Sequence, residues 1–117
     1  MKHLKEGRKL HRKRDQRKAL KKSLVTNLIQ KGRIKTTKAK AKEAQRLIER
    51  LITVAKKQDF NALRRIRQHL SAKVAQKLFY EIAPRYLKRK GGYTRIIHTS
   101  LHRKNDGSDL VILEFVE

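Results

Sequence analysis

Residues 33–57 have the sequence RIKTTKAKAKEAQRLIERLITVAKK, which predicts a short strand followed by a long amphipathic helix. The apolar side of this helix has to be covered by the rest of the chain. Isoleucine and threonine favour extended backbone, so residues 33–36 predict a short strand. Either Thr36 or Thr37 can cap the helix that follows, which we expect over residues 38–57. The apolar side chains of this helix recur at helical spacing and form one stripe: Ala44, Leu47, Ile48, Leu51, Ile52 and Ala55. A stripe of this kind packs against other elements of the fold.

Three further amphipathic helices flank this segment. Residues 16–31 predict the first, which ends at Lys31 and Gly32 because glycine suits the position after a helix and a cation suits its negative end. Asp59 and Ser71 are expected to cap two more helices, and Pro84 is expected to end the last. The side chains expected to point inward are Leu20, Leu24, Val25, Leu28 and Ile29 in the first, Phe60, Leu63, Ile66 and Leu70 after Asp59, and Val74, Ala75, Leu78, Phe79 and Ile82 after Ser71.

The C-terminal residues predict a β-hairpin. Residues 93–102 and 110–116 are rich in β-branched and aromatic residues, and a turn-forming cluster over residues 104–109 separates them. Val111, Leu113 and Phe115 share one face of the second strand, and Glu114 lies on the other. A lone hairpin is marginal in water, so we expect it to pair with strand 33–36. The pattern therefore predicts an α+β fold: one two-layer domain over residues 16–117, in the order helix, strand, three helices, two strands, with a small mixed or antiparallel sheet.

Positive charge is concentrated in the N-terminal third. The 117 residues hold 33 Lys+Arg against 10 Asp+Glu, a net charge of +23. The first 42 residues hold 17 basic residues and only two acidic ones, Glu6 and Asp15, a net of +15. Self-repulsion at this density opposes compaction unless a polyanion lies nearby. We expect residues 1–15 to form a basic N-terminal extension that becomes ordered on RNA.

Other function classes lack the residues they require. There is no cysteine, which removes thiolate zinc sites, and His98 and His102 fall in a predicted strand about 13 Å apart, too far for one metal ion. Carboxylates are few and scattered, and nucleophile motifs and phosphate-binding glycine loops are absent, so we expect no enzyme, metal, cofactor or small-molecule substrate. No run of 18 apolar residues and no secretory signal occurs, and the stripe of the basic first helix has a use in the core, so we expect no membrane partner.

Aromatic residues make up only 5% of the chain, too few for a platform that stacks single-stranded bases. This scarcity favours structured RNA that is recognised by its shape. Phe60, Phe79 and Phe115 are expected in the core. Tyr86 and Tyr93 flank a basic linker, where they are either a second RNA contact or ordinary surface tyrosines.

Several stretches are distinctive together and in this order: HLKEGRKL at residues 3–10, GRIKTT at 32–37 with KAKE at 40–43, KLFYEIAPRY at 77–86 with GGYTRI at 91–96, and EFVE at 114–117. They resemble the bacterial large-subunit ribosomal protein seventeen family over essentially the whole chain. The chain departs from that family's pattern at Ala39, where the family usually has proline, and in the extension at Glu6, His11 and the pair Asp15-Gln16.

The resemblance implies a structural, non-catalytic constituent of the large ribosomal subunit. It implies binding to large-subunit (23S) ribosomal RNA near the polypeptide exit tunnel, contact with neighbouring large-subunit ribosomal proteins, and a cytoplasmic location in the ribosome. The alternative from the charge alone is a free nucleic-acid packaging or regulatory protein. Co-sedimentation separates the two, because a packaging protein follows DNA and a ribosomal protein stays with large subunits in high salt.

Charge and resemblance together predict the RNA-binding residues. They fall in the extension, on the first helix, along residues 33–42 and in the linker of residues 85–95: Lys2, His3, Lys5, Arg8, Lys9, Arg12, Lys13, Arg14, Arg17, Lys18, Lys21, Lys22, Arg33, Lys35, Thr36, Thr37, Lys38, Lys40, Lys42, Arg85, Arg89, Lys90, Tyr93 and Arg95.

Overall fold

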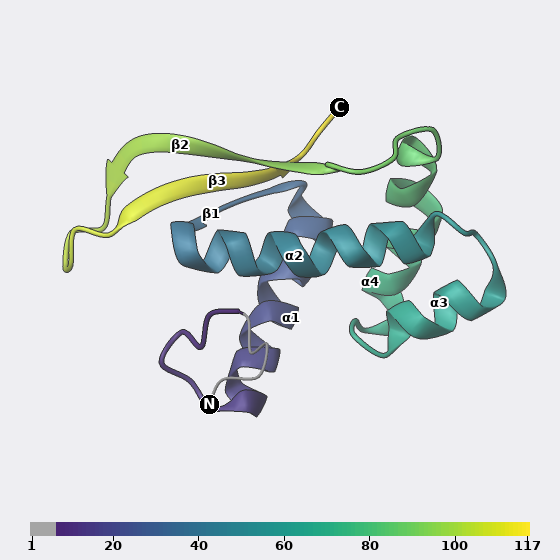
Figure 1. The fold of residues 1–117 in the computed structure, drawn as a ribbon, viewed down its shortest axis with the longest axis horizontal. Coiled ribbons are helices and arrows are strands. Elements are labelled where there is room, and N and C mark those ends of the chain that lie inside the picture. The colour runs from purple at the N-terminus through teal and green to yellow at the C-terminus, as the bar shows by residue number, and fades with distance from the viewer. Residues whose placement is uncertain (1–6) are drawn as a thin grey trace.

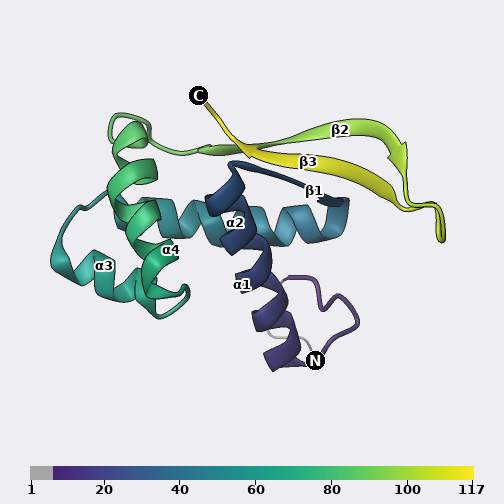
Figure 2. The ribbon, with the colours of Figure 1, turned by 180° about the vertical axis from the view of Figure 1, so that it is seen from behind.

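A computed structural model describes residues 7–117 of the chain. The elements follow in the order α1 (Arg14–Lys31), β1 (Arg33–Thr37), α2 (Lys38–Ala55), α3 (Phe60–Arg67), α4 (Ala72–Lys77), β2 (Thr94–His102) and β3 (Asp109–Phe115). Figure 1 shows the sheet as one layer and α2 running beneath it, and Figure 2 shows α1 crossing the far side of α2. This arrangement confirms the predicted α+β fold and its order of elements.

The sheet has three strands in the order β1–β3–β2, and both pairings are antiparallel. The hairpin therefore pairs with the strand near residue 34, as predicted, and it does so through β3. Val111, Leu113 and Phe115 are buried against the helices, whereas Glu114 points to the other face. A register shift between His98 and His102 marks an irregularity at the far end of β2.

The core is built around α2, whose whole predicted stripe is buried. Val25, Leu28 and Ile29 of α1 pack into the same core, as do Leu63, Ile66 and Leu70 and the predicted residues after Ser71. Gly32 ends α1 with φ of 83°, a left-handed conformation that glycine adopts without strain, and its N–H donates to the Leu28 carbonyl at 2.7 Å. The predicted end of the first helix is confirmed, while its start at Arg14 lies two residues before the predicted one.

Phe60 is a correction, because its side chain is 72% exposed rather than in the core. The Asp59 carboxylate accepts the Ala62 N–H at 2.7 Å, which confirms the cap and makes Phe60 the first helical residue. The buried stripe of this short helix is formed by Ala62, Leu63 and Ile66. Phe60 lies outside that stripe on the helix surface.

Pro84 is a second correction, because the helical path continues through it. After α4 the chain forms a π-helical turn, η1 (Leu78–Ile82), and a 3₁₀ turn, η2 (Ala83–Tyr86). Pro84 lies at the start of η2, where a missing N–H costs nothing. The residue before it keeps helical dihedral angles, φ of −58° and ψ of −38°.

Tyr86 and Tyr93 are also buried, with exposed fractions of 3% and 1%. Their ring centroids lie 5.4 Å apart, and the Tyr86 hydroxyl donates to the Val116 carbonyl. The two rings fill the core where η2 meets the start of β2. Neither is the surface tyrosine that the sequence suggests.

A single carboxylate joins the two layers. Glu49 of α2 accepts the Tyr93 N–H at 3.1 Å, the Thr94 N–H at 2.9 Å and the Thr94 hydroxyl at 2.7 Å. Backbone N–H groups at the start of a strand need an acceptor when they are buried, and here α2 supplies it. These three bonds fix where β2 begins relative to α2.

A second carboxylate holds the N-terminal part of the described chain. The backbone N–H and the Nη1 of Arg8 both donate to Oε1 of Glu43 at 3.1 Å, and Glu43 is only 5% exposed. Burial raises the pKa of Glu43, but the hydrogen bonds from Arg8 and the charges of Arg46 and Arg8 outweigh it, so the pKa lies below the usual value for a glutamate. We call this contact the Arg8–Glu43 tether.

Replacing Glu49 is expected to destabilise the fold. Glu49→Ala leaves two backbone N–H groups and a hydroxyl without their acceptor, and it should lower the free energy of unfolding by about 2–3 kcal/mol in urea denaturation. Glu81→Ala is the control, because Glu81 is exposed on η1, and it should stay within about 0.5 kcal/mol of the wild type. Equal effects of the two substitutions would refute the role given to Glu49.

The Arg8–Glu43 tether is expected to depend on pH with a definite sign. A carboxylate whose pKa is lowered by folding stabilises the folded state above its unfolded pKa, and this contribution disappears as the pH falls through the folded-state pKa. The amide shift of Arg8 should therefore titrate with a midpoint below that of an ordinary exposed glutamate. Glu43→Gln should abolish that titration and speed exchange of the Arg8 amide roughly fivefold, about 1 kcal/mol. A midpoint in the wild type at or above that of an ordinary exposed glutamate would contradict the tether.

Candidate nucleic-acid interface

Cations from distant parts of the chain line one hollow of about 760 Å³. Lys31, Gly32 and Arg33 lie on one side of it, and the turn and linker after Ala83 supply the rest of its charge: Arg85, Lys88 and Arg89. Two carboxylates, Glu114 and Glu117, also line it, so basic side chains outnumber acidic ones by five to two. We call this site the basic hollow.

The linker beside the basic hollow is held by its own hydrogen bonds. Lys56 donates to the Tyr93 hydroxyl at 2.9 Å and to the Arg89 carbonyl, and its Nζ lies 4.9 Å from the Tyr93 ring centroid. Arg89 Nε donates to the carbonyls of Gly91 and Gly92 at 3.2 and 3.1 Å. These contacts order the backbone of residues 89–93 while the side chain of Lys90 stays exposed.

The outer face of the sheet carries three more predicted residues. Arg33 and Arg95 both pair in register with Glu114, and Lys35 pairs with Ile112. Residues opposite one another in an antiparallel sheet point to the same face, so all three cations lie on the face away from α2. Arg95 Nε donates to Glu114 at 3.0 Å, an exposed pair that contributes little to stability and leaves Arg33 and Lys35 without ion pairs among residues 7–117.

The predicted cations of α1 and of the start of α2 lie on the surface. Arg14, Lys18 and Lys22 are exposed and Arg17 and Lys21 are half-buried; at the start of α2, Lys38 is exposed, and Lys40 and Lys42 are half-buried with Thr36 and Thr37. The first turn of α2 holds no acidic residue. Cations there oppose the helix dipole, which an anion in contact with them would offset.

The predicted residues of the extension divide at Gly7. Lys2, His3 and Lys5 lie outside the described residues. Arg8 is held by the tether, Arg12 donates to the Leu10 carbonyl at 2.7 Å, and Arg17 donates to the Arg12 carbonyl at 2.8 Å. Lys9 and Lys13 are exposed.

Tyr93 is a correction to the predicted site. Its ring is buried and its hydroxyl bonds to Lys56 and Lys90, so it has no surface to offer to RNA. Proximity in sequence to basic residues misleads here, because the neighbouring side chains point outward while the ring turns into the core. Lys31 and Lys88 are the opposite case: both line the basic hollow and both are missing from the predicted set. The sequence could have indicated both residues, because Lys31 precedes Gly32-Arg33 and Lys88 lies within the basic linker.

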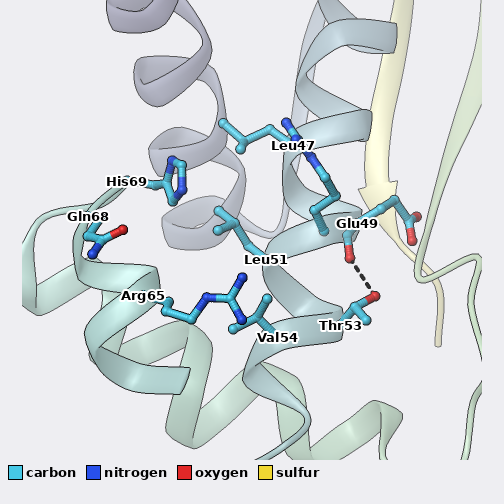
Figure 3. Close-up of a pocket in the computed structure, with 9 residues that line it drawn as sticks. Leu47, Glu49, Leu51, Thr53, Val54, Arg65, Gln68 and His69 are labelled. Carbon is cyan, nitrogen blue, oxygen red and sulfur yellow. Dashed lines mark hydrogen bonds between the residues drawn. The ribbon is translucent and has the colours of Figure 1, made fainter. Parts of the chain in front are cut away.

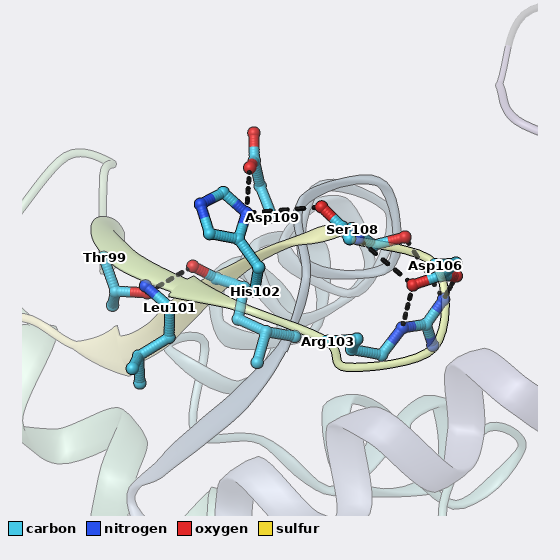
Figure 4. Close-up of polar contacts among 9 residues, drawn as sticks. Thr99, Leu101, His102, Arg103, Asp106, Ser108 and Asp109 are labelled. Atoms are coloured by element: carbon cyan, nitrogen blue, oxygen red, sulfur yellow. Dashed lines mark hydrogen bonds and ion pairs between the residues drawn. The ribbon is translucent and has the colours of Figure 1, made fainter.

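The charged side chains at the tip of the β2–β3 hairpin form contacts with one another (Figure 4). Arg103 and the Ser108 N–H both donate to Asp106, and His102 Nδ1 lies 2.9 Å from Asp109 Oδ1. The hydrogen bond from Arg103 holds the pKa of Asp106 well below its usual value. The charges of the tip are therefore largely paired with one another.

Two other kinds of site are absent from residues 7–117. No cluster of three or more His, Asp or Glu side chains that could hold a metal ion occurs there. Within the same residues, no helix has both the length and the apolar character needed to cross a membrane.

Comparison with known proteins agrees with the resemblance in the sequence. The family model described as "Ribosomal protein L17" matches residues 20–116. The "Large ribosomal subunit protein bL17" of Clostridium botulinum strain Hall is 46% identical over 110 residues, which cover 93% of this chain and 96% of that protein. The protein of the same name from Thermus thermophilus is 45% identical over 118 aligned positions, covering 100% of both. The chain belongs to the ribosomal protein L17 family, whose members are structural proteins and not enzymes.

Proposed function

We propose that this protein is a structural constituent of the bacterial large ribosomal subunit that binds the subunit's ribosomal RNA through phosphate contacts. Family membership supports a role in the ribosome, and hence a cytoplasmic location. The names of the relatives support the large subunit in particular. The RNA contact is argued from the residues of this chain.

The observation that carries the RNA contact is the basic hollow. Five cations from two segments more than fifty residues apart converge there, although like charges repel. The repulsion between these cations does not stabilise the fold itself. Their arrangement fits a phosphate backbone, which several side chains can contact at once. Arg33 belongs both to the hollow and to the outer face of the sheet, so the two surfaces are continuous.

The tether supports a second contact at the start of α2. Glu43 neutralises Arg8 and so lets a basic extension approach the part of α2 that carries Lys38, Lys40 and Lys42. From this point the extension runs toward its N-terminus, and we propose that it lies along RNA. The family resemblance supports a position near the polypeptide exit tunnel, with neighbouring large-subunit proteins in contact.

Removing cations of the basic hollow should weaken RNA binding in a salt-dependent way. We expect Arg33→Ala/Arg85→Ala to lower the slope of log affinity against log salt by about 2 and to weaken binding to a large-subunit ribosomal RNA transcript about 10- to 100-fold at 0.15 M salt. Lys57→Ala/Arg67→Ala is the matched control, because both residues are exposed and line none of the hollows described here. If both double variants lose the same affinity, the hollow is not the contact.

Deleting residues 2–7 tests the N-terminal end of the extension while leaving the Arg8–Glu43 tether, the Lys13 cap and all of α1 in place. We expect the shortened protein to keep the wild-type melting temperature within about 3 °C and to be recovered poorly with large subunits after a high-salt wash. Undiminished recovery would remove this end of the extension from the proposal. Recovery of the full-length protein with DNA instead of large subunits would favour a packaging or regulatory function.

A further inference from the structure

A second hollow region lies where α1, α2 and α3 meet, and most of its lining residues on α2 and α3 are outside the predicted site. Two adjoining hollows of about 470 and 420 Å³ share Leu47, Arg50, Gln68 and His69 in their walls. We call the two together the three-helix groove. Each is within the range of pockets that hold ligands of nucleotide size, about 300–1,000 Å³.

The walls of the three-helix groove are cationic. Each of the three helices supplies positive groups: Lys18, Lys21 and Lys22 from α1, Arg50 from α2, and Arg65 from α3. Asp15 and Glu49 also line the region, but the Glu49 carboxylate is bonded to Tyr93 and Thr94. Figure 3 shows that carboxylate pointing toward the strands, away from His69.

The floor of the groove is apolar where α2 passes under it. Leu47 and Leu51 are buried with exposed fractions of 9% and 4%, and Val54 is half-buried. In Figure 3 these side chains face Gln68 and His69 across the hollow, with Arg65 beside Val54. A cationic rim over an apolar floor suits a group with negative oxygens on one side and a carbon-rich body on the other.

His69 lines both hollows of the groove. Burial, Arg50 and Lys18 lower its pKa, in that order. Its ring makes no hydrogen bond within residues 7–117, and among the side chains that line the groove around it only Asp15 offers a free carboxylate. A bound anion would reverse these influences and favour the protonated ring.

We infer that the three-helix groove is a further RNA contact of this protein, in which Lys18, Arg50 and His69 hold a backbone phosphate and the attached sugar lies over Leu47 and Val54. The inference rests on the proposed function, since it names where further ribosomal RNA is bound. The inference adds four residues to the RNA-binding residues predicted from the sequence: Arg50, Arg65, Gln68 and His69. RNA is preferred to an acidic protein segment because the cations follow one another along α1 and into α2 and α3, as the charges of a polyphosphate do.

The first test compares two arginines one helical turn apart on α2. Arg50 lines both hollows, whereas Arg46 is exposed and lines neither. With a full-length large-subunit ribosomal RNA transcript at 0.15 M salt, Arg50→Ala should bind about 5- to 10-fold more weakly and lower the salt slope by about 1, and Arg46→Ala should stay within about twofold of wild type. Thermal unfolding checks that both variants are folded.

The outcomes separate this inference from the proposed function. If the wild type binds the large-subunit transcript no better than an unrelated RNA of equal length, the proposed function fails. If the wild type discriminates but Arg50→Ala and Arg46→Ala behave alike, the proposed function stands and the groove is not a contact.

The second test uses His69 as a reporter inside the groove. Its ring resonances are titrated by NMR in the full-length protein, alone and with a saturating uridine hexanucleotide. We expect the RNA to raise the pKa of His69 by about one unit or more, and Arg50→Ala to reduce that rise. An unchanged pKa overturns the inference, as does a rise caused by polyglutamate and not by the oligonucleotide, which would assign the groove to an acidic protein.

Discussion

Helix α2 has to be covered on two sides, and the rest of the structure follows from this constraint. One side of its apolar surface lies under the sheet and the other against α1, α3 and the helical turns after Ser71. Packing alone would let the sheet slide along the helix, because apolar contacts carry no direction. Glu49 removes that freedom, since its carboxylate bonds to two consecutive N–H groups at the start of β2.

Several of the ten acidic residues of this chain occupy structural positions, which matters at a net charge of +23. Glu43 holds Arg8, Glu49 holds the start of β2, Glu114 pairs with Arg95, and Asp106 pairs with Arg103 at the hairpin tip. Each binds donors that the fold itself brings together. The excess cations, by contrast, remain on the surface, where self-repulsion is lowest in water and where a polyanion relieves it.

The sequence was a good guide wherever a single element decides the outcome. Helical spacing located the α2 stripe, Asp59 was recognisable as a cap, and strand alternation placed Val111, Leu113 and Phe115 on one face. It was a poor guide where contacts with neighbouring elements decide whether a side chain is buried. Phe60 satisfies the spacing of a short helix and still lies outside its buried stripe, and Tyr93 sits among cations while its ring completes the core. The π turn before Pro84 also has no local signature.

The sequence predicts which segments of the candidate site are basic, but it does not predict the shape of the surface that they form. The reason is again that contacts between elements decide the outcome. Lys31 and Arg85, or Lys18 and His69, become neighbours only through packing, so no spacing along the chain reveals the hollows they line. Helix α1 connects the two regions, because Lys18 and Lys22 lie in its first half and Lys31 at its end. The helix is a rigid rod, and the stretch of it between these lysines and Lys31, roughly 14–20 Å at 1.5 Å per residue, sets the distance between the three-helix groove and the basic hollow. Under the proposed function, an RNA that enters both would be held at two points whose separation the core fixes, and a rigid spacing of this kind would favour an RNA of matching shape.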